Sequence, residues 1–327
     1  MPETFNYNYV ICGADGYYDI GYRDIMDLPN VNYHSLYTDS IRSKWLKRLV
    51  RLTFSKKVNQ YVSTPFSSIT YPRIYKPSFK DDRPLCFLFF GSVQYVYKTS
   101  YLAYLRAKYP DVKIVLYMQD LISRNHELNF QQCRDSFDLI LSYDQGDAQQ
   151  FGLHFHPTPM SPVDIECDPD LGPCDVFFCG YAKTRYPLIH EVYKRYTALG
   201  LKCDFHIMQF PQDEAKVDGI HYDNQIFTYR QNIQHVLNAK AILEIMQEGA
   251  DGFTPRVWES IIYDKHLLTN NLSLHHSEFF DPRFMHDIND PDIARLVNNP
   301  IAYDQISKNR LSPIHLLKFI DNLLSCQ

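Results

Sequence analysis

The segment FFCGYAKTR, residues 177–185, places a glycine and two cations where an apolar strand-like run gives way to a helical pattern. Gly180 lets a ligand approach the backbone closely, and Lys183 and Arg185 stand at the start of the helix. Cations beside free helix amides suit a diphosphate, because both stabilise negative charge. The segment therefore predicts an anion-binding turn, with a solvated basic turn as the alternative.

A second segment of this kind is QEGADGFTPRVWESII, residues 247–262, which follows the apolar run at 241–246. Thr254 is a favourable N-cap, and Pro255 falls at the first helical position, where its missing N–H removes nothing from the helix. The apolar residues that follow repeat at helical spacing, so the helix begins at about residue 255. Because HLLT at 266–269 is predicted as the next strand, the segment is the turn of a βαβ unit.

This turn is expected at the carboxyl end of a parallel strand, where open α/β sheets bind ligands. We expect the backbone amides of Gly252, Phe253 and Thr254 to point outward, where they can bind a phosphate. Arg256 can then reach a diphosphate, and Glu259 can accept a hydrogen bond from a ribose hydroxyl. The alternative is an ordinary capped helix in which Arg256 and Glu259 form an (i, i+3) ion pair.

Two aspartates follow strand-like runs in the first half of the chain. Asp15 lies in VICGADGYYDIGYRD, residues 10–24, and Asp120 follows the run at 112–118 within YMQDLI. Each is expected at the rim of a ligand-binding cleft, where it could serve as a general base or simply cap a helix. The glycines of the first turn lack the GxGxxG spacing, so a dinucleotide-binding fingerprint is absent.

Residues 40–57, SIRSKWLKRLVRLTFSKK, contain seven Lys or Arg and no acid, with Trp45 and several aliphatic residues between them. A basic amphipathic helix with an aromatic anchor is typical of a segment that lies on an anionic membrane surface. An acidic polymer as partner and a solvated face of a core helix are the alternatives. The segment therefore predicts a membrane contact, and the two alternatives remain open.

The sequence shows no recognised metal-binding pattern. His154-x-His156, the pair His275-His276 and two Asp-Pro-Asp steps do not form a set of three or four ligands at a known spacing. The eight cysteines form no CxxC pair, and those within apolar runs are typical of reduced core thiols in a cytoplasmic protein. We therefore expect no metal and no cofactor.

The composition is that of a globular protein. Of the 327 residues, 45% are hydrophobic and 22% are charged, which excludes wholesale disorder. The formal net charge of -5 argues against nucleic acid as the main partner. We expect neither a signal peptide nor a transmembrane run, and hence a cytoplasmic protein, attached peripherally to the inner membrane face if residues 40–57 bind lipid.

Strand-like runs alternate with helical patterns along almost the whole chain, which predicts parallel sheets. Five prolines interrupt the alternation at 157–174, the best candidate for a linker. We predict an N-terminal domain at 1–156 and a C-terminal domain at 175–327, with the last helix, near 313–325, alternatively packed on the N-terminal domain. The predicted fold is α/β, with two Rossmann-like domains facing a cleft.

These segments resemble those of the GT-B glycosyltransferases, particularly the bacterial enzymes that assemble capsular polysaccharide and lipopolysaccharide. FFCGYAKTR is similar to the first strand–helix turn of that family's donor domain, and residues 229–271 are similar to its donor-site block. Within the block, Asp251-x7-Glu259 resembles the family's acid-x7-Glu motif, with Asp where the family usually has Glu. FDLILSYDQGDAQQFGL, residues 137–153, resembles the strand and turn before the interdomain linker.

The resemblance implies an N-terminal acceptor-binding domain and a C-terminal domain that binds a nucleotide-sugar donor without an essential metal. It implies that Asp251 joins the donor contacts, and that helix amides and the cations of both turns stabilise the departing nucleoside diphosphate. It also implies a glycan or lipid-linked acceptor, which a carboxylate or histidine of the N-terminal domain would deprotonate if the enzyme inverts. We predict Asp15 as this general base, with Asp120 as the second candidate. The alternatives are a non-catalytic nucleotide- or glycan-binding protein and a metal-dependent GT-A transferase.

Overall fold

The chain forms two compact units, each built on its own sheet. The computed structural model describes all residues except 1–4, 14–16, 39–40, 56–65, 92–97, 123–129, 224–226, 248–251 and 327. Unit 1 comprises Met1–Ser161 and Ser312–Gln327, and unit 2 comprises Pro162–Leu311. Each unit contains a six-stranded sheet whose described strand pairs are all parallel.

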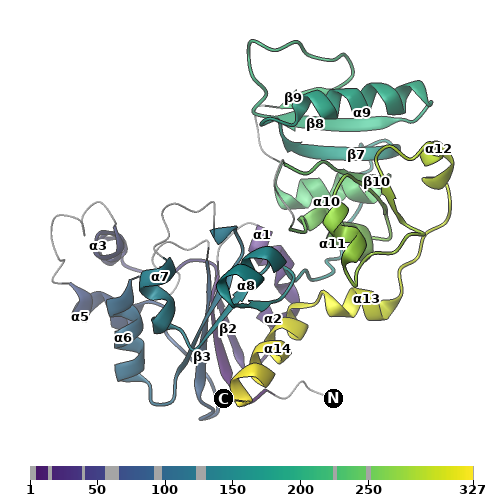
Figure 1. Ribbon diagram of the computed structural model, residues 1–327. Coiled ribbons are helices and arrows are strands. Elements are labelled where there is room, and N and C mark those ends of the chain that lie inside the picture. The colour runs from purple at the N-terminus through teal and green to yellow at the C-terminus, as the bar shows by residue number, and fades with distance from the viewer. Residues whose placement is uncertain are drawn as a thin grey trace. The chain divides into compact units, whose positions relative to one another are not determined.

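The sheet of unit 1 has the strand order β2-β1-β3-β4-β5-β6 (Figure 1). Its strands are β1 (Asn8–Cys12), β2 (Val31–His34), β3 (Leu85–Phe90), β4 (Lys113–Met118), β5 (Leu139–Ser142) and β6 (His154–Phe155). The helices and 3-10 turns of this unit are α1 (Tyr17–Gly21), α2 (Arg23–Met26), α3 (Lys44–Phe54), α5 (Ser67–Thr70), η1 (Tyr71–Arg73), α6 (Thr99–Lys108), α7 (Phe130–Cys133), η4 (Arg134–Ser136), α8 (Gln145–Phe151) and α14 (Pro313–Ser325).

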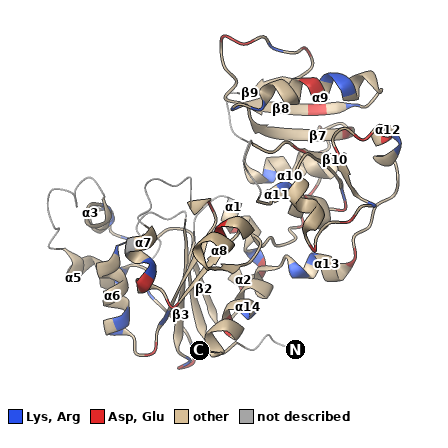
Figure 2. Cartoon of the chain, in the orientation of Figure 1, with Lys and Arg blue, Asp and Glu red and all other residues tan. Residues whose placement is uncertain are grey.

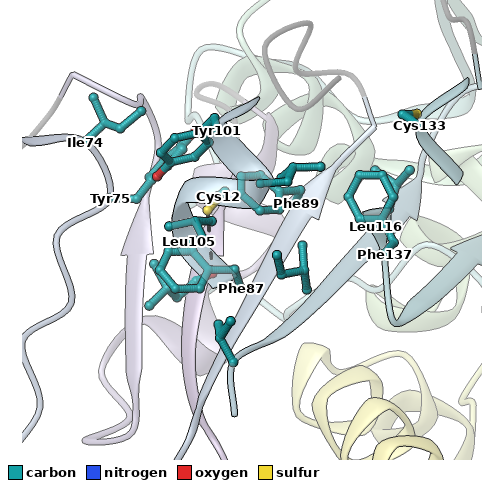
Figure 3. Close-up of a cluster of buried hydrophobic side chains, with 14 of the residues drawn as sticks. Cys12, Ile74, Tyr75, Phe87, Phe89, Tyr101, Leu105, Leu116, Cys133 and Phe137 are labelled. Atoms are coloured by element: carbon teal, nitrogen blue, oxygen red, sulfur yellow. Dashed lines mark hydrogen bonds between the residues drawn. The ribbon is translucent and has the colours of Figure 1, made fainter. Parts of the chain in front are cut away.

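Alternate residues of the central strand β3 build two cores, one on each face of this sheet. Phe87 and Phe89 pack in a cluster with Tyr101 and Leu105 of α6 (Figure 3). The intervening Leu88 and its alternate neighbours pack with α14 in the other cluster. Because both faces are covered, the strand is apolar along its whole length, as is typical of parallel sheets.

Helix α14 ends the chain but belongs to unit 1. Its buried Asp321 accepts hydrogen bonds from the backbone amide of Asn6 and from the hydroxyl of Tyr9, both at 3.0 Å. These two donors fix the helix against the start of β1. The last helix thus packs with the N-terminal unit, the arrangement that the sequence analysis considered as an alternative.

Both points at which the chain crosses between units are tied to the same aspartate of α2. The backbone amide of Asp24 donates to the hydroxyl oxygen of Ser161 at 2.9 Å, and the hydroxyl of Ser312 donates to the Asp24 carboxylate at 2.8 Å. The crossing after Ser161 falls inside the stretch 157–174, so that stretch is shared between the two units.

The sheet of unit 2 has the strand order β12-β11-β10-β7-β8-β9. Its strands are β7 (Cys174–Tyr181), β8 (Cys203–Met208), β9 (His221–Asp223), β10 (Ala239–Glu244), β11 (His266–Thr269) and β12 (Met285–Asp287). Its helices are α9 (Tyr186–Ala198), α10 (Tyr229–Asn238), α11 (Pro255–Ile262), the 3-10 helix η5 (Leu272–His276), α12 (Ile293–Leu296) and α13 (Gln305–Arg310).

Helices α9 and α10 cover opposite faces of the second sheet (Figure 1). Val192 of α9 packs with Phe205 of β8, whereas Val236 of α10 packs with Phe177 of β7. The outer side of α9 carries both acidic and basic residues, as expected for a face in water (Figure 2).

The predicted α/β fold with two parallel-sheet domains is confirmed. The predicted helix starts at about 255 and 313 are also confirmed, because Thr254 and Ser312 cap α11 and α14 and a proline takes the first position of each helix. The short edge strands β9 and β12 were not predicted. Within the described part of the chain, every helix is too short or too polar to cross a membrane.

Candidate functional site

The first candidate turn follows β7 and leads into α9. A Cβ on the buried Gly180 would lie 2.9 Å from a guanidinium nitrogen of Arg185, closer than real Cβ atoms approach. Arg185 donates through Nε to the carbonyl of Tyr181 at 3.1 Å, and its guanidinium also donates to the carbonyl of Ile245 after β10. Glycine at position 180 is therefore needed for the close packing of this arginine.

The second candidate turn follows β10 and leads into α11. Thr254 accepts a hydrogen bond from the amide of Arg256 at 3.3 Å, and its hydroxyl donates to one carboxylate oxygen of Glu244 at 2.5 Å. Thr269 of β11 donates to the other oxygen at 2.5 Å. Burial raises the pKa of Glu244, and the two hydroxyl donors oppose that rise. Glu244 thus ties the turn to the neighbouring strand, a role that the sequence analysis missed.

The backbone amides of this second turn fall into two groups. The backbone amide of Thr254 faces the Glu244 carboxylate and opposes the rise of its pKa. The amides of Gly252 and Phe253 donate to no described residue. The Phe253 ring is buried edge-on against Trp258, with ring centroids 5.7 Å apart, which fixes the turn in place. Two amides are therefore available to a ligand.

The two turns bring two arginines together. From the same Cβ position on Gly180, a guanidinium nitrogen of Arg185 lies at 2.9 Å and one of Arg256 at 3.6 Å. Both guanidinium groups stand over the ring of Phe178, at 5.9 and 6.0 Å from its centroid. Arg256 also donates to the carbonyl of Cys179. The turns therefore place two cations at one spot on the carboxyl edge of the sheet.

The electrostatics of this pair favour an anionic ligand. Burial, and then the neighbouring Arg256, lower the pKa of Arg185 to about 10. The charge of Arg256 thus makes that of Arg185 less favourable, while only carbonyl oxygens accept the described hydrogen bonds of both guanidinium groups. An anion bound between the two guanidinium groups would offset their mutual repulsion and accept charge-assisted hydrogen bonds from both.

Glu259 lies one turn after Arg256 on α11 but faces a different neighbour. Its carboxylate is buried and accepts a hydrogen bond from Nδ2 of Asn232, on α10, at 3.1 Å. Burial raises the pKa of Glu259, and the charge of Arg256 opposes that rise. Among the described ion pairs there is none between Arg256 and Glu259, so the structure does not contain the surface pair of the alternative interpretation.

The other predicted site residues do not join this group of contacts. Lys183 is exposed, has the left-handed φ of 43°, and makes no hydrogen bond or ion pair with the described residues. Asp120 follows β4 at the carboxyl edge of the first sheet, and partial burial of its carboxyl raises its pKa. Asp15 and Asp251 lie outside the described residues.

The sequence comparisons found no match. No protein-family model matches the chain, and neither does any curated protein. The fold, by contrast, is similar to that of several solved structures.

An α,α-trehalose-phosphate synthase (UDP-forming) from Burkholderia vietnamiensis has a TM-score of 0.54 at 10% identity, covering 97% of this chain and 99% of that chain. The corresponding enzyme from Burkholderia xenovorans has a TM-score of 0.49 at 11% identity, covering 97% and 96%. An α-glucosyltransferase in complex with UDP-glucose and DNA containing an abasic site has a TM-score of 0.48 at 9% identity, covering 96% and 90%. The first similarity, together with the two six-stranded parallel sheets, shows the GT-B fold of glycosyltransferases.

Proposed function

We propose that the protein is a glycosyltransferase that uses a nucleoside diphosphate sugar as donor and needs no metal for catalysis. The observation that carries this proposal is the convergence of Arg185 and Arg256 beside Gly180. It lies at the carboxyl edge of the second sheet, where open α/β sheets bind their ligands. The shared fold supports the class, since the first solved neighbour is by its name a UDP-forming synthase.

The proposed donor site extends from the arginine pair to both turns. The unpaired amides of Gly252 and Phe253 add two donors for the diphosphate. Lys183 adds a third cation near the start of α9. We assign the ribose to Glu259, whose carboxylate already accepts hydrogen bonds from the side chains of Asn232 and Tyr229, and the sugar to Asp251.

The proposed reaction breaks the bond between the anomeric carbon and the oxygen of the β-phosphate. The acceptor hydroxyl oxygen forms a new bond to that carbon, and the nucleoside diphosphate leaves with the bonding electron pair. Arg185 and Arg256 stabilise the charge that develops on the leaving phosphate. In an inverting reaction the hydroxyl proton passes to Asp15 or Asp120, and the raised pKa of Asp120 makes its carboxylate a stronger base than an ordinary aspartate.

We further propose that the acceptor is lipid-linked and that α3 holds the protein on an anionic membrane. The inner side of α3 buries Leu49 and Val50, whereas Trp45 is 67% exposed and Leu52 is 47% exposed. The name α3 surface is used below for Lys44, Trp45, Lys47, Arg48, Arg51 and Leu52.

The mixed character of the α3 surface favours a membrane over a soluble acidic glycan. A polyanion in water would bind the cations but would leave the exposed tryptophan and leucine in water, whereas a bilayer interface takes both. The α3 surface has a neighbour in α5, where Ile69 is also exposed. Each cation near an anionic surface contributes about 1 kcal/mol, so four of them give reversible, salt-sensitive attachment. Such a location suits the assembly of bacterial surface polysaccharide, the role implied by the resemblance to capsule and lipopolysaccharide enzymes.

The donor assignment is tested by binding. A thermal-shift panel of UDP-, GDP-, CDP- and TDP-sugars identifies the nucleotide. Calorimetry then compares the wild-type protein with Arg256→Ala. Loss of a charged hydrogen bond of about 1.5–3 kcal/mol should weaken binding roughly 10- to 150-fold.

Arg295→Ala is the matched control, because Arg295 is an exposed arginine of the same unit that pairs only with Asp292 among the described residues, at 2.9 Å. It should bind the nucleotide as the wild type does. Unchanged affinity in Arg256→Ala, or the absence of any stabilising nucleotide, would refute the assignment. Binding without release of nucleoside diphosphate, in the presence of any acceptor, would instead identify a nucleotide-binding protein.

A further inference from the structure

Unit 2 contains a cluster of one aspartate and two histidines outside the candidate donor site. Asp204 and His206 lie two residues apart on β8, so both side chains point to the same face of the sheet. His235 lies on α10, which covers that face. The Asp204 carboxylate accepts hydrogen bonds from Nε2 of His206 at 2.9 Å and from Nδ1 of His235 at 2.7 Å. The three ligand atoms all lie within 4.8 Å of one another.

Aromatic rings surround the two histidines of this cluster. Phe177 stacks on His235 with ring centroids 5.1 Å apart, and Phe227 lies 4.9 Å from the same ring and 4.7 Å from that of His206. His221 of β9 stacks on His206 at 4.6 Å. The histidine side chains are only 10% and 12% exposed, against 25% for the aspartate. The cluster is therefore a polar site in a largely apolar shell, where electrostatic interactions are strong.

The donor atoms of the cluster suit a cation. One carboxylate and two imidazoles form a mixed oxygen and nitrogen ligand set that borderline divalent ions such as Zn²⁺ prefer.

The cluster is separate from the candidate donor site on the same sheet. Asp204 lies opposite Phe177 in the strand register, whereas Gly180 lies three residues further along β7. Three strand residues span about 10 Å, so one ion could not bind both to Asp204 and to a diphosphate at Gly180. A ligand of the cluster is thus independent of the proposed glycosyl transfer.

We propose that Asp204, Nε2 of His206 and Nδ1 of His235 bind a divalent cation of the Zn²⁺ class, which clamps α10 onto β8. Around tetrahedral Zn²⁺, with bonds of about 2.0–2.1 Å, neighbouring ligand atoms lie roughly 3.3 Å apart. The contact between the carboxylate oxygen that binds the ion and its histidine therefore opens by roughly half an ångström as the ion enters. In each neutral imidazole the proton moves to the other ring nitrogen, and water supplies the fourth ligand.

The test uses the full chain, stripped of metal with EDTA, dialysed, and titrated with Zn²⁺ by calorimetry. We expect one tightly bound equivalent per chain and a higher unfolding temperature at saturating Zn²⁺. Asp204→Asn and His235→Gln should each weaken binding at least about 100-fold, since each removes a direct ligand. His276→Gln changes an exposed histidine of η5 in the same unit and should leave the affinity unchanged.

A second measurement needs no variant and so does not depend on how the variants fold. Crystals of the wild-type protein soaked in Zn²⁺ should show an anomalous-scattering peak bonded to all three side chains. The proposal would be overturned if both ligand variants bound Zn²⁺ with unchanged affinity, or if His276→Gln weakened Zn²⁺ binding equally. An anomalous-scattering peak elsewhere in the protein would also overturn it. The three residues would then be a hydrogen-bonded network that needs no ion.

Discussion

Replacing Gly180 with alanine adds one methyl group at the point where the two arginines meet. The new Cβ would lie 2.9 Å from a guanidinium nitrogen of Arg185, 3.1 Å from the ring of Phe178 and 3.6 Å from a nitrogen of Arg256. Ordinary contact begins at 3.4 Å, so the Arg185 guanidinium must retreat by several tenths of an ångström. The substitution thus moves one proposed diphosphate ligand while leaving both charges in the protein.

The size of the effect follows from the hydrogen bonds that Arg185 would lose. A charged hydrogen bond contributes about 1.5–3 kcal/mol, so Gly180→Ala should raise the donor dissociation constant roughly 10- to 150-fold. Overpacking should also lower the free energy of unfolding by about 1–3 kcal/mol. Calorimetry with the preferred nucleotide measures the first effect, and thermal unfolding measures the second.

Gly172→Ala is the matched control, since among the described residues a Cβ there would meet only Lys202 Nζ, at 3.4 Å. This control should bind the nucleotide as the wild type does. If Gly180→Ala folds and binds with wild-type affinity, Arg185 does not contact the diphosphate and the reasoning from the arginine pair fails.

Either Asp15→Asn or Asp120→Asn removes the general base, and that variant should lose about 10²-fold or more in kcat while keeping its donor affinity. Normal turnover in either variant would remove that residue from the mechanism. Burial lowers the pKa of His156 from 6.5 to about 4, so the folded protein binds fewer protons than the unfolded chain between those pH values. Stability should therefore fall as the pH drops through this window, by about 3 kcal/mol in total, and thermal melts of His156→Gln should show a shallower fall; equal slopes would contradict this origin. Changing the four cations of the α3 surface to Gln should abolish salt-sensitive co-sedimentation with anionic vesicles and preserve nucleotide binding. If the wild-type protein does not co-sediment with such vesicles at low salt, α3 is only a solvated helix.

The parts of the fold that local chemistry determines could be predicted from the sequence. Thr254 and Pro255 mark the start of α11 because capping depends on neighbouring residues alone. The apolar runs that became β3, β4 and β7 were recognisable because strands of a parallel sheet are buried on both faces. The strands β9 and β12 have three residues each, too few to show a pattern.

Contacts that depend on tertiary structure were only partly predictable. Gly180, Arg185 and Arg256 were expected at one sheet edge, and the structure brings them together because their turns follow the adjacent strands β7 and β10. The role of Glu244 was missed, although an acid at the end of an apolar strand, close to Thr254, was a usable signal.

The cluster of Asp204, His206 and His235 was not predicted, for a related reason. Asp204 and His206 show the i, i+2 spacing of one strand face, but their third partner, His235, comes from a helix later in the chain. No fixed sequence spacing relates a strand to a helix that packs on it. The prediction of no metal rested on motif spacing alone, so it could not detect this set.

The most direct test of the proposed donor site is a crystal structure of the protein with the nucleoside diphosphate that stabilises it most. We expect the diphosphate to lie against the guanidinium groups of Arg185 and Arg256, within hydrogen-bond distance of the amides of Gly252 and Phe253. A nucleotide bound elsewhere, with the two arginines still donating only to backbone carbonyls, would contradict the proposed function.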